Sequence, residues 1–170
     1  MRQFGAAAID TIPPDDPTVS TPSQPVELPA RLFPPAQWEN VDQFGYVALP
    51  AIAARAVILS FKVPIGRNGI IKKVANNFVG AGFQEGQGNI VWRILVDGAP
   101  PPGANSYDSI SGSLGSPANP TEIAGFRIFE NQTVQLVADN IAIIVAGQLV
   151  GGRLVGYLYP RELEPENVWI

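Results

Sequence analysis

The sequence predicts an all-β protein, an antiparallel β-sandwich that carries an extended N-terminal arm. From residue 46 onward apolar and polar residues alternate in short segments, and turns rich in glycine and proline separate six to eight of them. The arm is predicted because the first 35 residues hold eight of the 17 prolines and only one of the 17 glycines. No window shows a sustained helical pattern of apolar residues, so a jelly roll is the expected form of the sandwich.

The arm is predicted to span residues 1–44. Prolines fix φ and remove backbone donors, so this segment favours extended or polyproline II backbone. Its composition buries too little apolar surface to order the segment by itself, and we expect a groove on a neighbouring subunit to hold it. Folding back over its own domain is the alternative. The candidate anchors are Phe4, Ile9, Ile12, Val19, Val26, Leu28, Leu32, Phe33 and Trp38.

The sandwich domain is predicted to span residues 45–161. Its clearest strand has Ile90, Trp92 and Ile94 on one face, and a turn at Glu130-Asn131 joins two later strands. Residues 103–121 are expected to form a long loop around one short strand. The expected strands are residues 57–63, 70–79, 90–96, 107–110, 126–129, 133–138, 141–145 and 148–159. In the last strand Gly151-Gly152 suits a bulge or a close backbone approach.

Aromatic residues outside the arm receive two different interpretations. Trp92, Tyr157 and Tyr159 lie in apolar stripes and are expected in the core or in a subunit interface, with a glycan-stacking surface as the alternative. Residues 162–170 form an acidic tail with an apolar end. We expect Trp169 and Ile170 to be a second docking contact, because an aromatic residue after a polar tail is not typical of a domain's own core.

The composition argues against several kinds of chemistry. The chain has no cysteine and no histidine, which excludes disulfides, thiolate nucleophiles, Cys/His zinc sites and Ser-His-Asp triads. Carboxylates group only at Asp15-Asp16 in the arm and in the tail, where no cleft can tune them for acid-base catalysis. We therefore expect a protein that is not an enzyme and that has no cofactor, no metal site and no catalytic residue.

Charge and hydropathy narrow the expected partners. The net charge is −4 and no basic run is present, so nucleic acid is not an expected partner. No stretch approaches the ~20 apolar residues that span a bilayer, so no membrane contact is expected. With 46% hydrophobic and only 15% charged residues, part of the apolar surface is expected to be covered by partners.

Three stretches carry a resemblance to a known family: IVWRILVDGAPPPG, LGSPANPTEIAGFRIFENQTVQLVADN and GGRLVGYLYPRELE. Together they resemble small jelly-roll structural proteins of tailed-bacteriophage virions, over about residues 65–162. The resemblance implies a capsid-decoration, collar, neck or fibre-base element, made in the host bacterial cytoplasm and located in the virion. It further implies that the protein binds copies of itself, with a trimer assumed, and other virion proteins. Attachment would be through the arm, and no catalytic residues are implied.

One binding function and one catalytic function stand as alternatives. The protein would be a receptor- or glycan-binding module of a phage fibre or tail if residues 80–89 and 98–121 form a binding edge, with Tyr107 as the residue to test. A hydrolase on a β scaffold is the catalytic alternative. It lacks support because the chain has no histidine, no cysteine and no paired carboxylates placed in a cleft.

Overall fold

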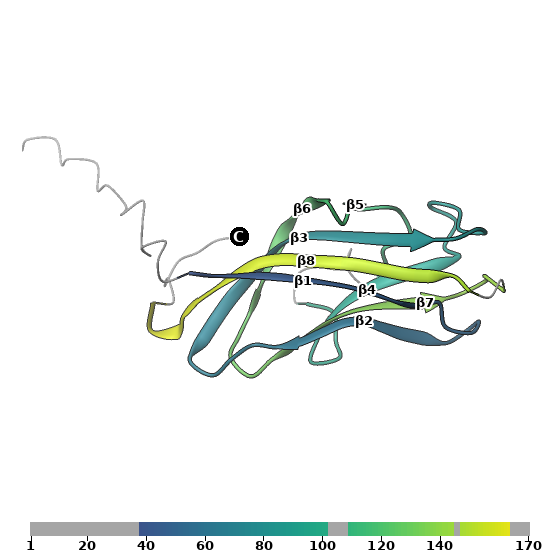
Figure 1. Cartoon of the computed structure of the whole chain (residues 1–170). Coiled ribbons are helices and arrows are strands. Elements are labelled where there is room, and N and C mark those ends of the chain that lie inside the picture. The colour runs from purple at the N-terminus through teal and green to yellow at the C-terminus, as the bar shows by residue number, and fades with distance from the viewer. Residues whose placement is uncertain (1–37, 102–108, 145–146, 164–170) are drawn as a thin grey trace, which may run out of the picture. The chain divides into compact units, whose positions relative to one another are not determined.

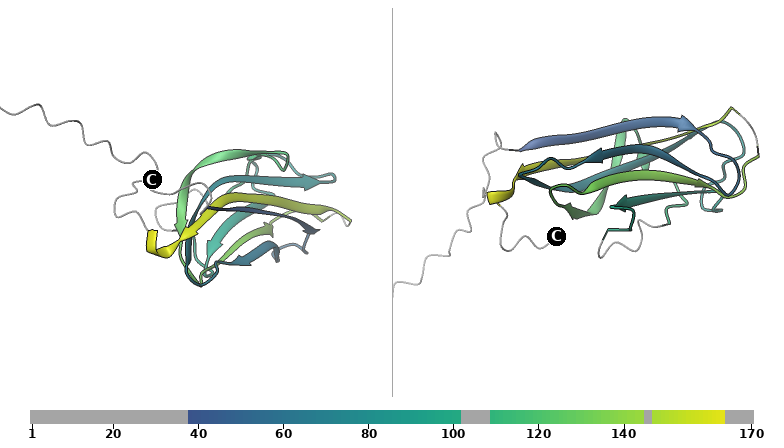
Figure 2. Two further views of the ribbon diagram at one scale, coloured as in Figure 1. Left: turned by 60° about the vertical axis from the view of Figure 1, so that its left-hand side comes forward. Right: turned by 90° about the horizontal axis from the view of Figure 1, so that it is seen from below.

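Two antiparallel sheets pack face to face in the computed structural model, which describes residues 38–101, 109–144 and 147–163 (Figure 1). The two layers are seen from further directions in Figure 2. In chain order the elements are β1 (Glu39–Ala48), β2 (Arg55–Lys62), β3 (Arg67–Val79), β4 (Ile90–Val96), β5 (Gly115–Ser116), β6 (Asn119–Ile128), β7 (Thr133–Asn140), β8 (Leu149–Pro160) and the 3-10 helix η3 (Arg161–Leu163).

The order of the strands is that of a jelly roll. One sheet has the order β1-β8-β3-β6-β5 and the other β2-β7-β4. The chain therefore passes from one sheet to the other between β1 and β2, between β2 and β3, and between β3 and β4. The later strands return in reverse order and pair with the earlier ones: β6 with β3, β7 with β2 and β8 with β1. An isolated bridge from Trp92 to Ile110 adds a fourth pairing at the far edge of the smaller sheet. Such a double-sheet, folded-over arrangement confirms the predicted sandwich and its jelly-roll form.

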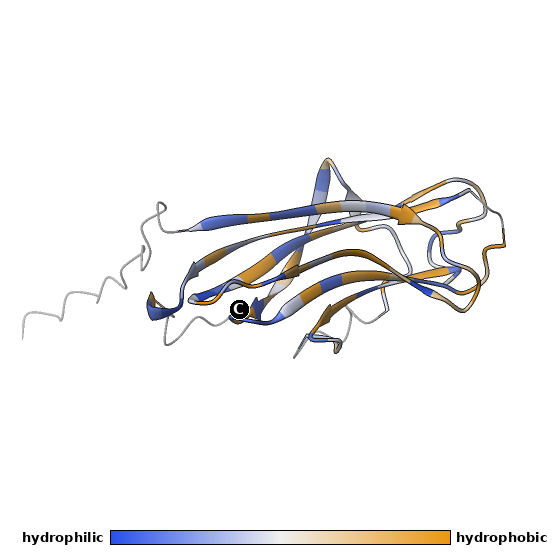
Figure 3. Cartoon of the chain, turned by 60° about the horizontal axis from the view of Figure 1, so that its bottom comes forward, coloured by the Kyte–Doolittle hydropathy of each residue, from blue (hydrophilic) through white to orange (hydrophobic). Residues whose placement is uncertain are grey.

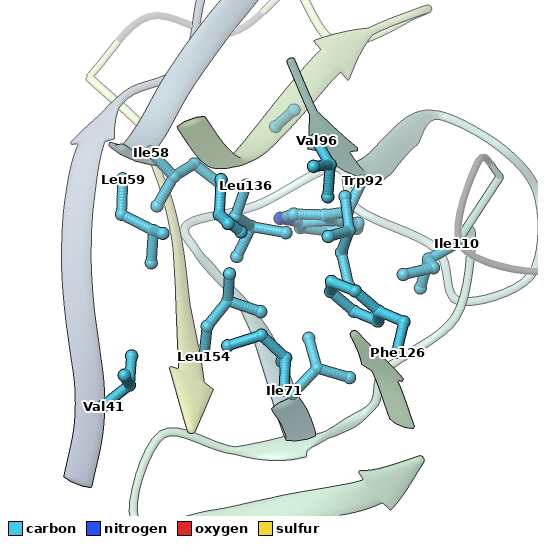
Figure 4. Close-up of a cluster of buried hydrophobic side chains, with 14 of the residues drawn as sticks. Val41, Ile58, Leu59, Ile71, Trp92, Val96, Ile110, Phe126, Leu136 and Leu154 are labelled. Atoms are coloured by element: carbon cyan, nitrogen blue, oxygen red, sulfur yellow. The ribbon is translucent and has the colours of Figure 1, made fainter. Parts of the chain in front are cut away.

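The core lies between the two sheets. Side chains of alternate residues point inward, so that Ile71 and Leu154 of the larger sheet meet Leu136 and Trp92 of the smaller one (Figure 4). All four are almost fully buried. The same alternation appears along the strands in Figure 3 as a change between hydrophobic and hydrophilic residues. It explains why residues 90–96, where the alternation is most regular, form a strand with the predicted bounds.

The larger sheet begins earlier in the chain than predicted. Strand β1 starts at Glu39, so residues 39–44, which the sequence analysis placed in the arm, pair with β8. They escaped prediction because the inward positions of β1 include Gln43 and Gly45, which break the apolar stripe. Gly45 is needed there: a Cβ at this position would lie 2.7 Å from the backbone oxygen of Ile58 in β2.

Two other predicted boundaries were wrong. Residues 141–144 were predicted as a strand but form a loop, and β6 begins at Asn119, inside the segment predicted as a loop. The turn at Glu130-Asn131 is present between β6 and β7, which lie in different sheets. The predicted short strand at 107–110 lies partly outside the described residues, and its last residue forms the bridge to Trp92.

The Gly151-Gly152 pair is a close backbone approach rather than a bulge. The registers of β8 with β1 and with β3 run without a shift through both glycines. At Gly152 a Cβ would overlap the side chain of Leu136 from the facing sheet and would lie 2.9 Å from the backbone oxygen of Ala75. The glycine therefore lets the two sheets approach each other at this point.

Candidate functional site

Exposed aromatic side chains gather on the outer face of β1 and β8. Because side chains alternate along a strand, Phe44 and Tyr46 point away from the core that holds Val41. Trp38, just before β1, and Tyr157 of β8 lie on the same face. Phe44 is 54% exposed. Trp38, Phe44, Tyr46 and Tyr157 are named the aromatic face below.

Two of these rings stack on each other. The centroids of Trp38 and Tyr157 lie 4.4 Å apart and the ring planes are 14° from parallel. The ammonium group of Lys72 lies 5.9 Å from the centroid of Tyr157, within range of a cation-π interaction. Trp38 was predicted as an anchor of the arm on a neighbour, but it packs on its own chain and thereby becomes part of a surface.

The other two rings are also held in place. Phe44 and Tyr46 meet edge to face, with their centroids 5.1 Å apart. The ring of Tyr46 lies over Gly151 of β8, and its hydroxyl oxygen accepts a hydrogen bond of 2.5 Å from Nδ2 of Asn77 in β3. Contacts across three strands therefore hold Phe44 and Tyr46 in these positions.

An ion pair lies beside Phe44. Arg153 of β8 donates two hydrogen bonds to the carboxylate of Asp42, from Nε to Oδ1 at 2.6 Å and from Nη2 to Oδ2 at 2.5 Å. Its Nη1 donates to the carbonyl oxygen of Pro117 at 2.5 Å, which ties the β5–β6 turn to β8. The hydrogen bond from Arg153 lowers the pKa of Asp42 most; burial opposes it, and the charge of Arg153 adds to it. These residues, with Phe44 and Ala118, line an open groove of about 460 Å³.

A second ion cluster lies on the outer face of the smaller sheet. Asp139 of β7 accepts hydrogen bonds from Nε of Arg55 in β2 at 2.6 Å and from Nε of Arg93 in β4 at 2.7 Å. The hydrogen bond from Arg55 lowers the pKa of Asp139 most; burial opposes it, and Arg93 adds to it. Because the cluster links all three strands of this sheet, we interpret it as structural.

The predicted site residues fall into three groups. Trp92 and Tyr159 are buried, as expected, whereas Tyr157 belongs to the aromatic face. Trp38 lies against Tyr157. The others lie outside the described residues: Phe4, Ile9, Ile12, Val19, Val26, Leu28, Leu32, Phe33, Tyr107, Trp169 and Ile170.

Sequence reasoning missed Asp42, Phe44 and Tyr46. Asp42 and Phe44 lay in the segment that was assigned to the arm, and Tyr46 stood at the predicted start of the alternating segments. A usable signal was present, since Asn40, Asp42, Phe44 and Tyr46 occupy every second position, which is the spacing of one face of a strand. Their exposure, however, follows only from which face the sheet buries.

Neither a metal site, nor a membrane-spanning helix, nor a related protein was found that would identify the function of this surface, as far as the described residues and the comparisons go. Within the described ranges, no group of three or more acidic residues is placed to hold a metal ion. The described part of the chain also contains no helix with the length and hydrophobicity that crossing a bilayer requires. Comparison with protein-family models, curated proteins and solved structures gave no match to this chain.

Proposed function

We propose that the protein is a non-enzymatic structural component of a phage virion, which self-associates through its sandwich and is anchored to neighbouring subunits by its N-terminal arm. The resemblance of residues 65–162 to small virion proteins supports this proposal, and so does the jelly-roll fold, which is common among viral structural proteins. A fold by itself does not establish a function, so the main argument comes from the surface.

The observation that carries the proposal is the aromatic face. Tyr, Trp, Phe and Arg are the residues enriched at the centres of protein contacts, and Trp38, Phe44, Tyr46 and Arg153 share one side of the sheet. Their fixed positions reduce the entropy that a partner must overcome on binding.

The arm has the chemistry that such a surface binds. Proline-rich segments are preformed in an extended conformation and dock onto surfaces lined with aromatic side chains. Eight prolines and several spaced apolar residues precede residue 36. We therefore assign the aromatic face of one copy as the docking surface for the arm of a neighbouring copy.

The experiment compares four proteins by sedimentation velocity: the full chain, a chain without residues 1–35, Phe44→Asp and Phe129→Asp. Phe129 is the matched control, because it is also an exposed phenylalanine but follows the end of β6, which β3 separates from β8 and β1 in the sheet. We expect the truncated chain and Phe44→Asp to stay folded and soluble but to form smaller assemblies than the full chain. Phe129→Asp should form assemblies of the same size as the full chain. Unchanged assembly of the truncated chain would contradict anchoring by the arm.

The virion assignment needs its own measurement. Mass spectrometry of phage particles purified from cells that carry the gene should detect the chain at a copy number well above trace contamination. Its absence from particles that contain the other virion proteins would overturn the assignment.

A glycan-binding module is the second candidate. The groove beside Phe44 favours it, because the carboxylate of Asp42 and the guanidinium of Arg153 flank an exposed aromatic ring, a combination that suits the hydroxyl groups and the apolar face of a sugar. Binding to a panel of host surface glycans that is lost in Phe44→Ala or in Tyr107→Ala would favour this function. No binding across the panel would count against it.

A further inference from the structure

Two neighbouring loop segments of the sandwich contain no polar side chain. Residues 49–54, between β1 and β2, read Leu-Pro-Ala-Ile-Ala-Ala, and residues 141–144, after β7, read Ile-Ala-Ile-Ile. Surface loops are normally rich in polar residues and in turn-forming residues. Ile144 is nevertheless 84% exposed, and Ile52 and Ile141 are each about half exposed.

The exposed apolar residues continue onto the larger sheet at the same end. Leu149, the first residue of β8, and Val79, the last of β3, are directly paired, and both are exposed. At this end, on the right in Figure 3, hydrophobic loop segments lie beside hydrophilic ones. We name this surface the apolar tip. It consists of Ile52, Val79, Ile141, Ile144 and Leu149.

A buried asparagine holds the two loops together. Asn140, only 1% exposed, donates from Nδ2 to the carbonyl oxygens of Pro50 and Ile143, both at 2.8 Å. Its Oδ1 accepts a hydrogen bond of 2.9 Å from the backbone N–H of Ile143. Its own backbone exchanges hydrogen bonds with Ala53 and Ala54. The exposure of Ile52 and Ile141 is therefore a property of hydrogen-bonded backbone.

The fold does not require these side chains to be apolar. Ile143 packs into the core, but Ile141 and Ile144 point away from it. Single exposed apolar residues are ordinary, whereas several of them at one end of a domain indicate a contact surface. A partner that covers the apolar tip would explain why these exposed positions carry apolar side chains, which the isolated domain does not require.

The apolar tip also has a hollow beside its projecting residue. Next to Ile141 lies an open hollow of about 540 Å³, and Ile144 projects from the same loop. The hollow is lined by Ala53, Ala54, Arg55, Asp139, Asn140 and Ile141. A surface that contains both a projecting side chain and a hollow can pair with an identical surface turned by a twofold rotation, since each copy then fills the other.

We infer that the apolar tip binds the apolar tip of a second copy about a twofold axis, with Ile144 of each copy entering the hollow of the other. This inference rests on the proposed self-association and names the surface that carries part of it. Asp139 in the lining of the hollow is already paired with Arg55 and Arg93, so this carboxylate needs no charge from the partner.

A lipid bilayer fits the apolar tip less well than a second copy does. Segments that insert into the membrane interface combine apolar residues with Lys or Arg and often with Trp or Tyr. Neither 49–54 nor 141–144 contains any of these four residue types. A preformed hollow is also of no use in a fluid bilayer, but it is what a protein contact requires.

The absence of cysteine from the chain permits a direct test on the full-length protein. Ala142→Cys places a single thiol on the exposed loop of the apolar tip, and Ile65→Cys places one on a residue that is 80% exposed in the β2–β3 turn, at the opposite end of the sandwich. Treated with a short bismaleimide, Ala142→Cys should give a covalent dimer and Ile65→Cys should not. Adding Ile144→Asp to Ala142→Cys should lower the dimer yield by about tenfold or more, because a charge replaces a buried apolar side chain.

The outcomes separate this inference from the proposed function. If the full chain self-associates in sedimentation but Ala142→Cys gives no more covalent dimer than Ile65→Cys, the tip contact is wrong while the structural role remains. If Ile144→Asp leaves the dimer yield unchanged, the contact does not use the projecting residue and the inference is also wrong. Flotation with phosphatidylcholine vesicles tests the lipid: binding of the full chain that is lost in Ile144→Asp would identify a bilayer as the occupant and overturn the inference.

Discussion

The ring of Tyr46 in β1 lies across the backbone of Gly151 in β8, and glycine is the residue that leaves room for it. The ring thereby reaches over one strand to Asn77 of the next, whose Nδ2 donates to the tyrosine hydroxyl. An edge strand with few inward apolar residues is in this way fastened to the sheet from outside. The same contact fixes part of the aromatic face, so the stability of β1 and the shape of the proposed docking surface depend on one glycine.

Gly151→Ala is expected to displace Tyr46 and to lower the free energy of unfolding by about 1 kcal/mol, because the new Cβ overlaps a ring that can still turn towards solvent. Urea unfolding followed by circular dichroism measures the change. Gly112→Ala is the control, since its added Cβ would meet only Glu85 at an ordinary distance of 3.6 Å. If Gly151→Ala costs as much in a Tyr46→Ser background as in the wild type, the ring is not the cause.

Gly152→Ala is expected to cost more, about 3 kcal/mol, although the two glycines are adjacent. Its side chain points inward, where a Cβ would overlap Leu136 and would lie 2.9 Å from the backbone oxygen of Ala75. Packed side chains and backbone cannot move aside as an exposed ring can. The same urea titration measures the difference, and a smaller loss for Gly152→Ala than for Gly151→Ala would contradict the close approach of the two sheets.

The parts of the fold that the sequence predicts are those in which one face is continuously apolar. Residues 90–96 alternate without a break and form β4 with the predicted bounds. In β1 the inward stripe is interrupted by Gln43 and Gly45, and the outward positions carry the aromatic residues, so the pattern is not that of a half-buried strand. The run at 141–144 is apolar but forms a loop. The apolar character of so short a run does not distinguish a strand from a loop.

The candidate site depended on information that no local pattern contains. Asp42 and Arg153 are 111 positions apart, and their pairing follows from the register of β1 with β8. The exposure of Phe44 likewise follows from which face of the larger sheet is covered by the smaller one. Sequence reasoning identified residue types suited to a docking role, but only the topology places them on one surface.

Stability is expected to fall at acid pH in a way that depends on Asp139. Hydrogen bonds from Arg55 and Arg93 lower the pKa of this carboxyl group in the folded protein. A lowered pKa stabilises the fold above the pKa of the unfolded state, about 4 for aspartate, and this contribution is lost as the pH falls through the folded pKa. Thermal unfolding at pH 7 and at pH 3 should therefore show a larger drop for the wild type than for Asp139→Asn, and equal drops would contradict the prediction.

Asn140→Ala is expected to lower the free energy of unfolding by about 3 kcal/mol, because it leaves the buried carbonyl oxygens of Pro50 and Ile143 without their donor. Asn77→Ala, which removes a single exposed hydrogen bond, is the control and should cost under about 1 kcal/mol. Hydrogen exchange adds a local measurement, since the amides of residues 49–54 and 141–144 should lose protection before those of the strands. If these loops stay protected in Asn140→Ala, the asparagine does not organise the apolar tip, and the fixed geometry that the tip-to-tip contact requires has another origin.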